Sequence, residues 1–239
     1  MSRTPLIEVA FEIRFQPRNN LATELLLETN SKFPNAVKVS NSEGSKIPEE
    51  LKTRQPELYY MPSYRVVYKD FSLLISDGSL VVLKNFITGQ YQGWEYFKPI
   101  VLKLINILET KNKASEVQRY SLKYTNLFDE ESLYKSKLMF DISLGKQKFN
   151  FNDNFELKTE THDKHYVTML IASSNVGVIN SCDLNGTETR LSGFLLIIDL
   201  IANVDSFEVQ NIERDLEDLH TRVYQEFKNI YPDDKSVEG

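Results

Sequence analysis

Residues 5–15 alternate between apolar and mostly charged side chains, and this alternation constrains the fold more than any other feature of the sequence. The two series are Ile7, Val9, Phe11, Ile13 and Phe15 on one side, and Glu8, Ala10, Glu12 and Arg14 on the other. A period of two over this length predicts a strand that buries one face and exposes the other. Pro17 ends the strand, because proline has no N–H to donate to a neighbouring strand.

A helix, a loop and three short strands are predicted next. Residues 21–33 have the leucine spacing of a short helix, and we expect Asn20 to be its N-cap. Residues 34–62 are polar and contain several prolines, which is typical of a long mobile loop. Asp77-Gly78 suits a hairpin turn with positive φ. The strands are expected at residues 64–69, 72–75 and 80–84.

A second helix and a long strand complete the first half of the chain. The helix opens at Tyr91–Glu95, and Pro99 requires that it either starts late or is kinked. Its apolar stripe is Phe97, Val101, Leu104, Ile105 and Leu108. Residues 117–128 alternate again, with Tyr120, Leu122 and Tyr124 on one face and Arg119, Ser121 and Lys123 on the other.

The order of these elements is that of a ferredoxin-like split β-α-β layer. In that topology the first and last strands are neighbours. Glu8 and Glu12 are then expected to face Arg119 and Lys123 across the outer side of the sheet. The topology leaves open a shift of one residue in the pairing of the two strands.

The second half of the chain is predicted to be a β-meander followed by a long helix. Strands are expected at residues 138–144, 155–161, 166–172 and 176–183, with a turn at 162–164. Residues 194–202 are almost wholly apolar and predict a central strand buried on both faces. A capping-box-like start at 205–208 precedes a helix that runs from Val209 to Ile230 and ends at Pro232. The fold class is therefore α+β with antiparallel sheets, in two halves, 1–130 and 131–239, packed as one unit.

Composition excludes several classes of protein. Lys and Arg total 28 and Asp and Glu total 34, a net charge of −6, which argues against a dedicated binder of duplex DNA but allows a local basic patch. The single cysteine, Cys182, excludes a disulfide framework and a multi-cysteine zinc site. No apolar run approaches the length of a membrane span, and the first residues do not resemble a signal peptide. We therefore expect a cytoplasmic protein.

No motif of a common enzyme class is present, and neither a cofactor nor a metal is predicted. His162 and His165 are two ligands without a third, so we expect a solvated hairpin tip. Glu8 and Glu12 share a strand face, which is compatible with metal-assisted phosphodiester chemistry but more typical of a solvated sheet face.

Five residues are candidates for binding, and none is assigned a catalytic role: Glu8, Glu12, Arg119, Lys123 and Trp94. Trp94 is either a partner-binding anchor or a packing residue. Tyrosines alternate with basic residues, as in a base-stacking platform. The same alternation, however, directs Tyr120 and Tyr124 away from the charged face.

Four short motifs occur in a specific order along the chain. They are the opening PLxEVxFExRF pattern of Pro5–Phe15, the Gly-Trp-Glu helix start within Tyr91–Glu95, Leu122–Asn126, and Leu216–His220 with Phe227. Together they resemble an uncharacterised family of sporadically distributed prokaryotic proteins of similar length. Members more often have Pro-Gly-Trp at Gln92–Trp94 and Arg-Tyr at Lys123-Tyr124. The resemblance implies no established activity, but the patchy distribution is like that of mobile defence or toxin–antitoxin genes.

These observations favour a non-catalytic protein-binding component of a bacterial two-gene or multi-gene system, in antiphage defence or a toxin–antitoxin pair. Its partner is expected to be another protein encoded nearby, since an acidic protein suits a basic partner; a homodimer is a further alternative. The alternative function is binding or metal-dependent processing of nucleic acid. No association with a membrane is expected.

Overall fold

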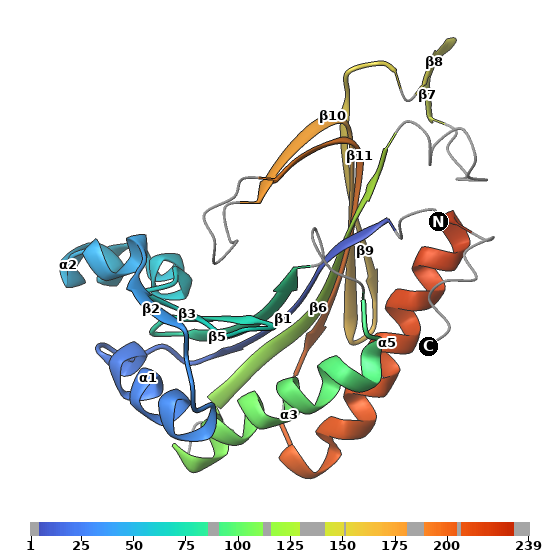
Figure 1. Ribbon diagram of the computed structural model, residues 1–239. Coiled ribbons are helices and arrows are strands. Elements are labelled where there is room, and N and C mark those ends of the chain that lie inside the picture. The colour runs from blue at the N-terminus through green and yellow to red at the C-terminus, as the bar shows by residue number, and fades with distance from the viewer. Residues whose placement is uncertain are drawn as a thin grey trace.

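The main strands of the protein join into one antiparallel sheet that is backed by helices. The computed structural model describes residues 5–85, 91–111, 116–129, 142–150, 152–180, 189–204 and 207–231 (Figure 1). Within these residues one sheet has nine strands in the order β2-β3-β4-β5-β1-β6-β11-β10-β9, and β7 and β8 form a separate hairpin. The strands are β1 (Leu6–Phe15), β2 (Lys38–Asn41), β3 (Tyr64–Val67), β4 (Ser72–Ile75), β5 (Ser79–Asn85), β6 (Val117–Phe128), β7 (Ile142–Leu144), β8 (Gln147–Phe149), β9 (Glu156–Asp163), β10 (Tyr166–Asn180) and β11 (Thr189–Asn203). The helices are α1 (Leu21–Lys32), α2 (Glu49–Arg54), α3 (Trp94–Thr110) and α5 (Ile212–Ile230), with short 3-10 helices η1 (Glu43–Lys46), η2 (Pro56–Tyr60) and η4 (Val209–Asn211). This is the predicted α+β class.

The topology predicted for the first half is confirmed. β1, α1, the β4–β5 hairpin, α3 and β6 follow one another along the chain, and their strands are ordered β4-β5-β1-β6. The first and last strands, β1 and β6, are therefore antiparallel neighbours, as in a ferredoxin-like layer. β3 and β2 extend the sheet beyond β4.

The prediction of a mobile loop over residues 34–62 is wrong. The segment contains β2, η1, α2 and η2. Lys52 in α2 forms a buried ion pair with Asp77, with 2.7 Å between Nζ and Oδ2. Gly44 in η1 packs so closely that a Cβ there would lie 2.3 Å from the carbonyl oxygen of Met61. Tertiary contacts thus order a segment whose own composition is typical of a loop.

The turn at Asp77-Gly78 differs from the sequence predictions in two local details. Asn20 occupies the N-cap position of α1, as predicted, but its φ is 62° and its side chain makes no capping hydrogen bond. Asp77 Oδ1 accepts a hydrogen bond from the Ala22 N–H instead, at 2.9 Å. The β4–β5 turn contains Asp77 and Gly78, as predicted, but neither residue has a positive φ. A Cβ at position 78 would lie 2.8 Å from the Tyr60 ring, so close packing and not backbone conformation favours glycine there.

The second half of the chain continues the same sheet. β11 pairs with β6, and β9, β10 and β11 form the predicted meander. The strand predicted at 176–183 is not separate, because β10 runs into this segment past a bulge between Ser173 and Val176. The strand at 194–202 is central, as predicted, but only one of its faces is fully buried: Ile197, on the other face, is partly exposed.

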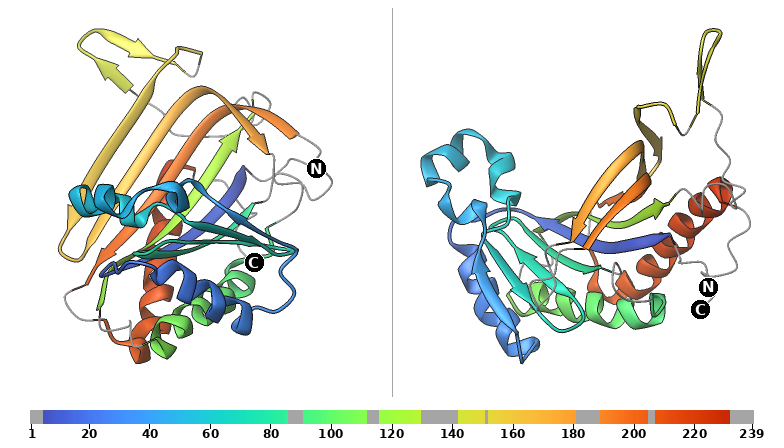
Figure 2. Two further views of the ribbon diagram at one scale, coloured as in Figure 1. Left: turned by 90° about the vertical axis from the view of Figure 1, so that its left-hand side faces the viewer. Right: turned by 45° about the horizontal axis from the view of Figure 1, so that its top comes forward.

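All three longer helices, α1, α3 and α5, pack on one face of the sheet (Figures 1 and 2). The predicted apolar stripe of α5 is buried, namely Ile212, Leu216, Leu219, Val223 and Phe227. α5 begins at Ile212, after η4, and so starts later than predicted. α3 begins at Trp94, so Pro99 lies inside it and the helix does not start late. Cys182, Pro232 and the features predicted at 138–141 and 205–206 fall outside the described residues.

None of the helices described is long and apolar enough to cross a bilayer.

Candidate binding face of the sheet

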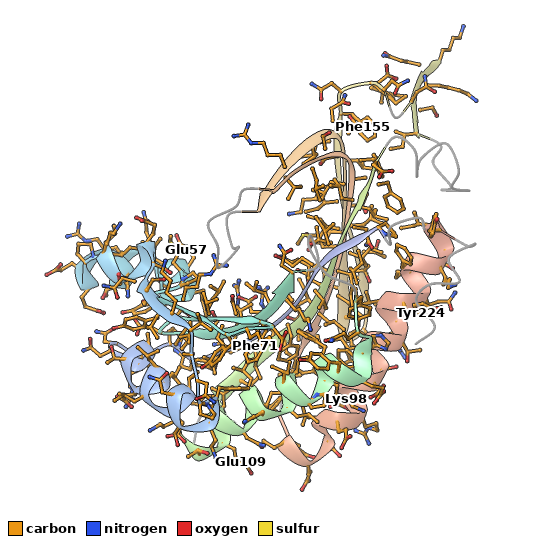
Figure 3. All side chains as sticks on the ribbon, viewed as in Figure 1. Glu57, Phe71, Lys98, Glu109, Phe155 and Tyr224 are labelled. Carbon is orange, nitrogen blue, oxygen red and sulfur yellow. The ribbon has the colours of Figure 1, made fainter. Side chains whose placement is uncertain are left out.

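The sheet face opposite α1, α3 and α5 is called here the open face. The sheet bends so that this face is concave, with α2 at one rim and the ends of β10 and β11 at the other (Figures 1 and 2). Described side chains crowd between the sheet and the helices, as around Phe71 and Lys98, whereas few fill the space between Glu57 and Phe155 (Figure 3).

Six charged side chains lie together in the middle of the open face. We call them the ionic belt: Glu8, Glu12 and Arg14 of β1, Arg119 and Lys123 of β6, and Asp199 of β11. Glu12 Oε2 lies 3.0 Å from Arg14 Nε and 3.5 Å from Arg119 Nη2. Glu8 Oε1 lies 3.6 Å from Lys123 Nζ. The structure therefore brings together four of the five predicted binding residues.

The register of the belt differs from the predicted direct opposition of acids and bases. Glu8 and Glu12 stand opposite Thr125 and Ser121. Each glutamate reaches its cation diagonally, two residues away on β6, a distance that long side chains can span. The β1–β6 pairing was predictable from topology, but its register was not.

Arg14 and Asp199 belong to the belt although neither was among the predicted site residues. Asp199 stands opposite Lys123 in the β6–β11 pairing. Burial raises the pKa of Asp199, while Lys123 and a hydrogen bond with Ser121 act against that rise. A signal for both residues was present in the sequence. Arg14 continues the charged series of the first strand, and Asp199 is the one charge in residues 194–202.

The charges of the belt are balanced within the chain, since it has three acidic and three basic members. The Glu12 and Glu8 side chains are 23% and 27% exposed, and ion pairs as accessible as these stabilise a fold by about 1 kcal/mol or less each. Among the described residues, no group of three or more His, Cys, Asp or Glu is placed to hold a metal ion. The belt can exchange its ion pairs for polar groups of a ligand, but its carboxylates do not form a concentrated negative site.

Two strips of aliphatic side chains flank the ionic belt on the open face. The β4–β5 strip consists of Leu74, Val81 and Leu83, and the β10–β11 strip of Val167, Met169, Ile171, Ile197 and Ile201. Their positions follow from the register, because Val81 pairs with Glu12 and Met169 pairs with Asp199. All of them except Ile201 are partly exposed.

The rim of the open face near α2 is built by the segment that was predicted to be a loop. η2 places the ring of Tyr60 over Arg14, with 4.7 Å from the guanidinium carbon to the ring centroid. The Tyr60 hydroxyl donates to Gln118 Oε1 at 2.9 Å. One end of the belt is thereby held between the sheet and η2.

Trp94, the fifth predicted binding residue, lies on the helix-covered face and is separate from the belt. It is 4% exposed, and its ring stacks on His220 at 4.6 Å between centroids and 3° between planes. Trp94 Nε1 donates to Glu217 Oε1 at 3.1 Å, and Lys98 Nζ lies 2.6 Å from the same oxygen. Trp94 therefore joins α3 to α5 as a packing residue.

The remaining sequence predictions concern tyrosines and histidines. Tyr120 and Tyr124 are buried on the helix-covered face, as predicted, and so offer no stacking platform on the open face. The turn of the β9–β10 hairpin lies at residues 164–165 and not at 162–164, so His165 is in the turn as predicted, whereas His162 is in β9 and pairs with Val167. The exposed His162 lies 3.2 Å from Glu160.

Comparison with known proteins assigns neither a family nor an activity. The chain matches no protein-family model and no curated protein. The family resemblance inferred from its sequence motifs therefore stays a prediction.

Proposed function

We propose that the protein is a non-catalytic, cytoplasmic component of a bacterial system encoded by two or more genes, such as antiphage defence or a toxin–antitoxin pair, and that it binds another protein of that system. The open face is its binding surface. The observation that carries this proposal is the charge-balanced belt between two partly exposed aliphatic strips, on the face that α1, α3 and α5 leave uncovered.

The composition of this face suits a protein partner. Interfaces between proteins combine apolar contact area with polar groups that find partners. Met169 and Ile171 sit beside Asp199 and Ile197 in the β10–β11 register, so a partner would meet apolar and polar groups at neighbouring positions. A concave surface also allows a partner to contact both aliphatic strips at once.

Nucleic acid is a weaker candidate for the same face. Affinity for a phosphate backbone comes from an excess of Lys and Arg, whereas the belt contains equal numbers of acids and bases. Base stacking needs exposed aromatic rings, and Tyr120 and Tyr124 are buried on the other side of the sheet.

The test is co-expression of the chain with each product of the neighbouring genes, followed by size-exclusion chromatography and calorimetry. One variant, Met169→Glu, places a charge in the β10–β11 strip. The control, Leu27→Glu, changes an α1 residue that is 68% exposed. We expect Met169→Glu to weaken binding by roughly tenfold or more, because an unpaired charge buried at an interface is costly, and Leu27→Glu to leave it unchanged.

Separate elution of every neighbouring product would contradict the proposal. Equal weakening by both variants would place binding elsewhere on the protein. Salt-dependent binding of single-stranded oligonucleotides would favour the nucleic-acid alternative instead.

A further inference from the structure

β9 is the outer strand of the nine-stranded sheet, and its free edge carries a self-complementary pattern of charge. Within the described residues β9 pairs only with β10. The left view of Figure 2 shows it along the margin of the sheet. Every residue of β9 except Leu157 is exposed. An exposed strand of this length has unpaired backbone N–H and C=O groups, to which another strand can add.

The β9–β10 register determines which residues face the free edge. Asp163 pairs with Tyr166 across a two-residue turn, and further along the hairpin Phe155 O accepts from Ser174 N at 3.1 Å. In an antiparallel pair these groups alternate along the strand. Odd-numbered residues of β9 therefore direct their backbone groups to β10, and even-numbered residues direct theirs outward.

The outward-facing residues Glu156, Lys158 and Glu160 alternate in charge along the strand, His162 follows them, and all four side chains share the open face. Isolated charges on an edge strand discourage pairing. Here, however, an antiparallel second copy centred on Thr159 places Lys158 opposite Glu160, and Glu156 opposite His162, in both directions.

The neighbouring registers are unfavourable. Outward-facing residues must meet outward-facing residues, so an allowed register moves the two-fold axis by whole residues. An axis at Lys158 places Lys158 opposite its own copy and Glu156 opposite Glu160. An axis at Glu160 places Glu160 opposite its own copy. Like charges directly opposite one another destabilise a sheet, so of these three registers only the axis at Thr159 avoids them. It also overlaps seven β9 residues of each copy, whereas axes at Leu157 and Thr161 overlap only three and five.

We propose that two copies of the chain associate through antiparallel pairing of β9 with β9 about a two-fold axis at Thr159. The nine-stranded sheet then continues from one copy into the other. Because this axis is perpendicular to the sheet, both open faces point to the same side of the dimer. This inference does not depend on the proposed function of the open face.

The main test uses charge reversal and sedimentation velocity over a dilution series. Lys158→Glu and Glu160→Lys each create two like-charge pairs at the interface, so each variant is expected to be monomeric where the unaltered chain is dimeric. An equimolar mixture of the two restores both pairs and is expected to form a heterodimer. The double variant Lys158→Glu/Glu160→Lys is expected to dimerise alone. Lys158 and Glu160 are both exposed in the single chain, so these changes are not expected to prevent folding. Circular dichroism checks that each variant is folded.

Three results would overturn the proposal: a monomeric unaltered chain at the highest concentration, a single variant that stays dimeric, or a mixture of variants that does not associate. A cross-link tests the register directly. In a Cys182→Ser background, Thr159→Cys places two thiols at a non-hydrogen-bonded pair, where Cα atoms lie about 4.5 Å apart and a disulfide can form. Thr161→Cys is the control, because its two copies lie roughly 13 Å apart along the strand. Equal cross-linking of both variants, or of neither, would contradict the Thr159 axis.

Discussion

Lys52 and Asp77 form the most deeply buried ion pair of the described chain, with side chains 8% and 5% exposed. The two oxygens of Asp77 have different partners. Oδ2 lies 2.7 Å from Lys52 Nζ, and Oδ1 accepts from the Ala22 N–H at the start of α1. One carboxylate therefore holds α2 and α1 against the β4–β5 turn.

Replacing Lys52 is predicted to be strongly destabilising. Lys52→Met leaves the buried charge of Asp77 without its partner, and such a change lowers the free energy of unfolding by about 3–5 kcal/mol. Urea unfolding at pH 7 measures this. The double variant Lys52→Met/Asp77→Asn is expected to recover much of the loss, because the amide oxygen still accepts from Ala22 and no charge is left buried. An equal cost for the single and double variants would contradict this explanation.

His220 makes stability depend on pH. It stacks between Trp94 and Tyr224 and borders a cavity of about 30 Å³, room for one or two water molecules. Burial lowers its pKa to about 4; the charge of Glu217 acts against this lowering and that of Lys98 adds to it. The unfolded chain, with a histidine pKa near 6.5, binds a proton first. Folding stability is therefore lost as the pH falls from about 6.5 towards 4, by on the order of 2–3 kcal/mol.

His220→Phe is predicted to reduce this loss, because phenylalanine keeps the stacking and takes up no proton. Urea unfolding of the variant and the unaltered chain at pH 7 and pH 5 measures the difference. His165→Phe, in the exposed turn between β9 and β10, controls for the removal of a histidine. If both variants retain the full loss between the two pH values, His220 is not its source.

At the scale of the element, the join between β6 and β11 depends on one glycine. A Cβ at Gly193 would lie 2.1 Å from the carbonyl oxygen of Phe128 and 2.9 Å from its carbonyl carbon. These are backbone atoms and cannot move aside as a flexible side chain does. The end of β6 can approach β11 this closely only if residue 193 has no side chain.

Gly193→Ala is therefore predicted to destabilise the protein by about 1–3 kcal/mol, the usual cost of overpacking. Gly177→Ala is the matched control, since a Cβ there meets nothing within 4 Å and the two glycines lie one pair apart in the β10–β11 ladder. Thermal unfolding of both variants tests the prediction. A similar cost at both positions would show that the destabilisation comes from replacing a strand glycine as such and not from a clash with the backbone of Phe128.

Elements with a periodic pattern of apolar residues over many positions were predictable from the sequence, and elements held in place by residues distant in the sequence were not. The alternation of β1 and β6 and the stripe of α5 depend on each segment's own burial pattern, and all three are confirmed apart from Ile7. A register shift between Leu6 and Glu8 places Ile7 outside the main core, in a small cluster with Leu127. α2 has six residues and depends on Lys52 meeting Asp77, a contact that no local pattern encodes.

The same distinction applies to the candidate site. The adjacency of β1 and β6 follows from the topology of the first half, so Glu8, Glu12, Arg119 and Lys123 were selected together. Asp199 was missed, because the pairing of β11 with β6 joins the two halves of the chain.

At the scale of the whole molecule, the two halves share one sheet and one main hydrophobic core. The core includes Phe11 of β1 and Leu216 of α5. β6 pairs with β1 on one side and β11 on the other. The interface between the halves is thus a run of backbone hydrogen bonds with a common core beneath it.

We therefore predict one cooperative unfolding transition for the whole chain. Phe11→Ala and Leu216→Ala are each expected to lower the free energy of unfolding by about 2–5 kcal/mol, since both side chains are completely buried, and to shift the same transition. Fluorescence of the single tryptophan and far-UV circular dichroism should give coincident curves. Two resolved transitions, each sensitive to one of the variants, would show that the halves unfold separately.

The placement of all three longer helices on one side of the sheet has a consequence for how this protein can diversify. The main hydrophobic core lies on that side, whereas the side chains of Val81, Met169 and Ile197 point to the other. Substitutions at these three positions leave the interior packing intact. A lineage of such proteins can therefore acquire new recognition properties by point mutation while inheriting its architecture unchanged.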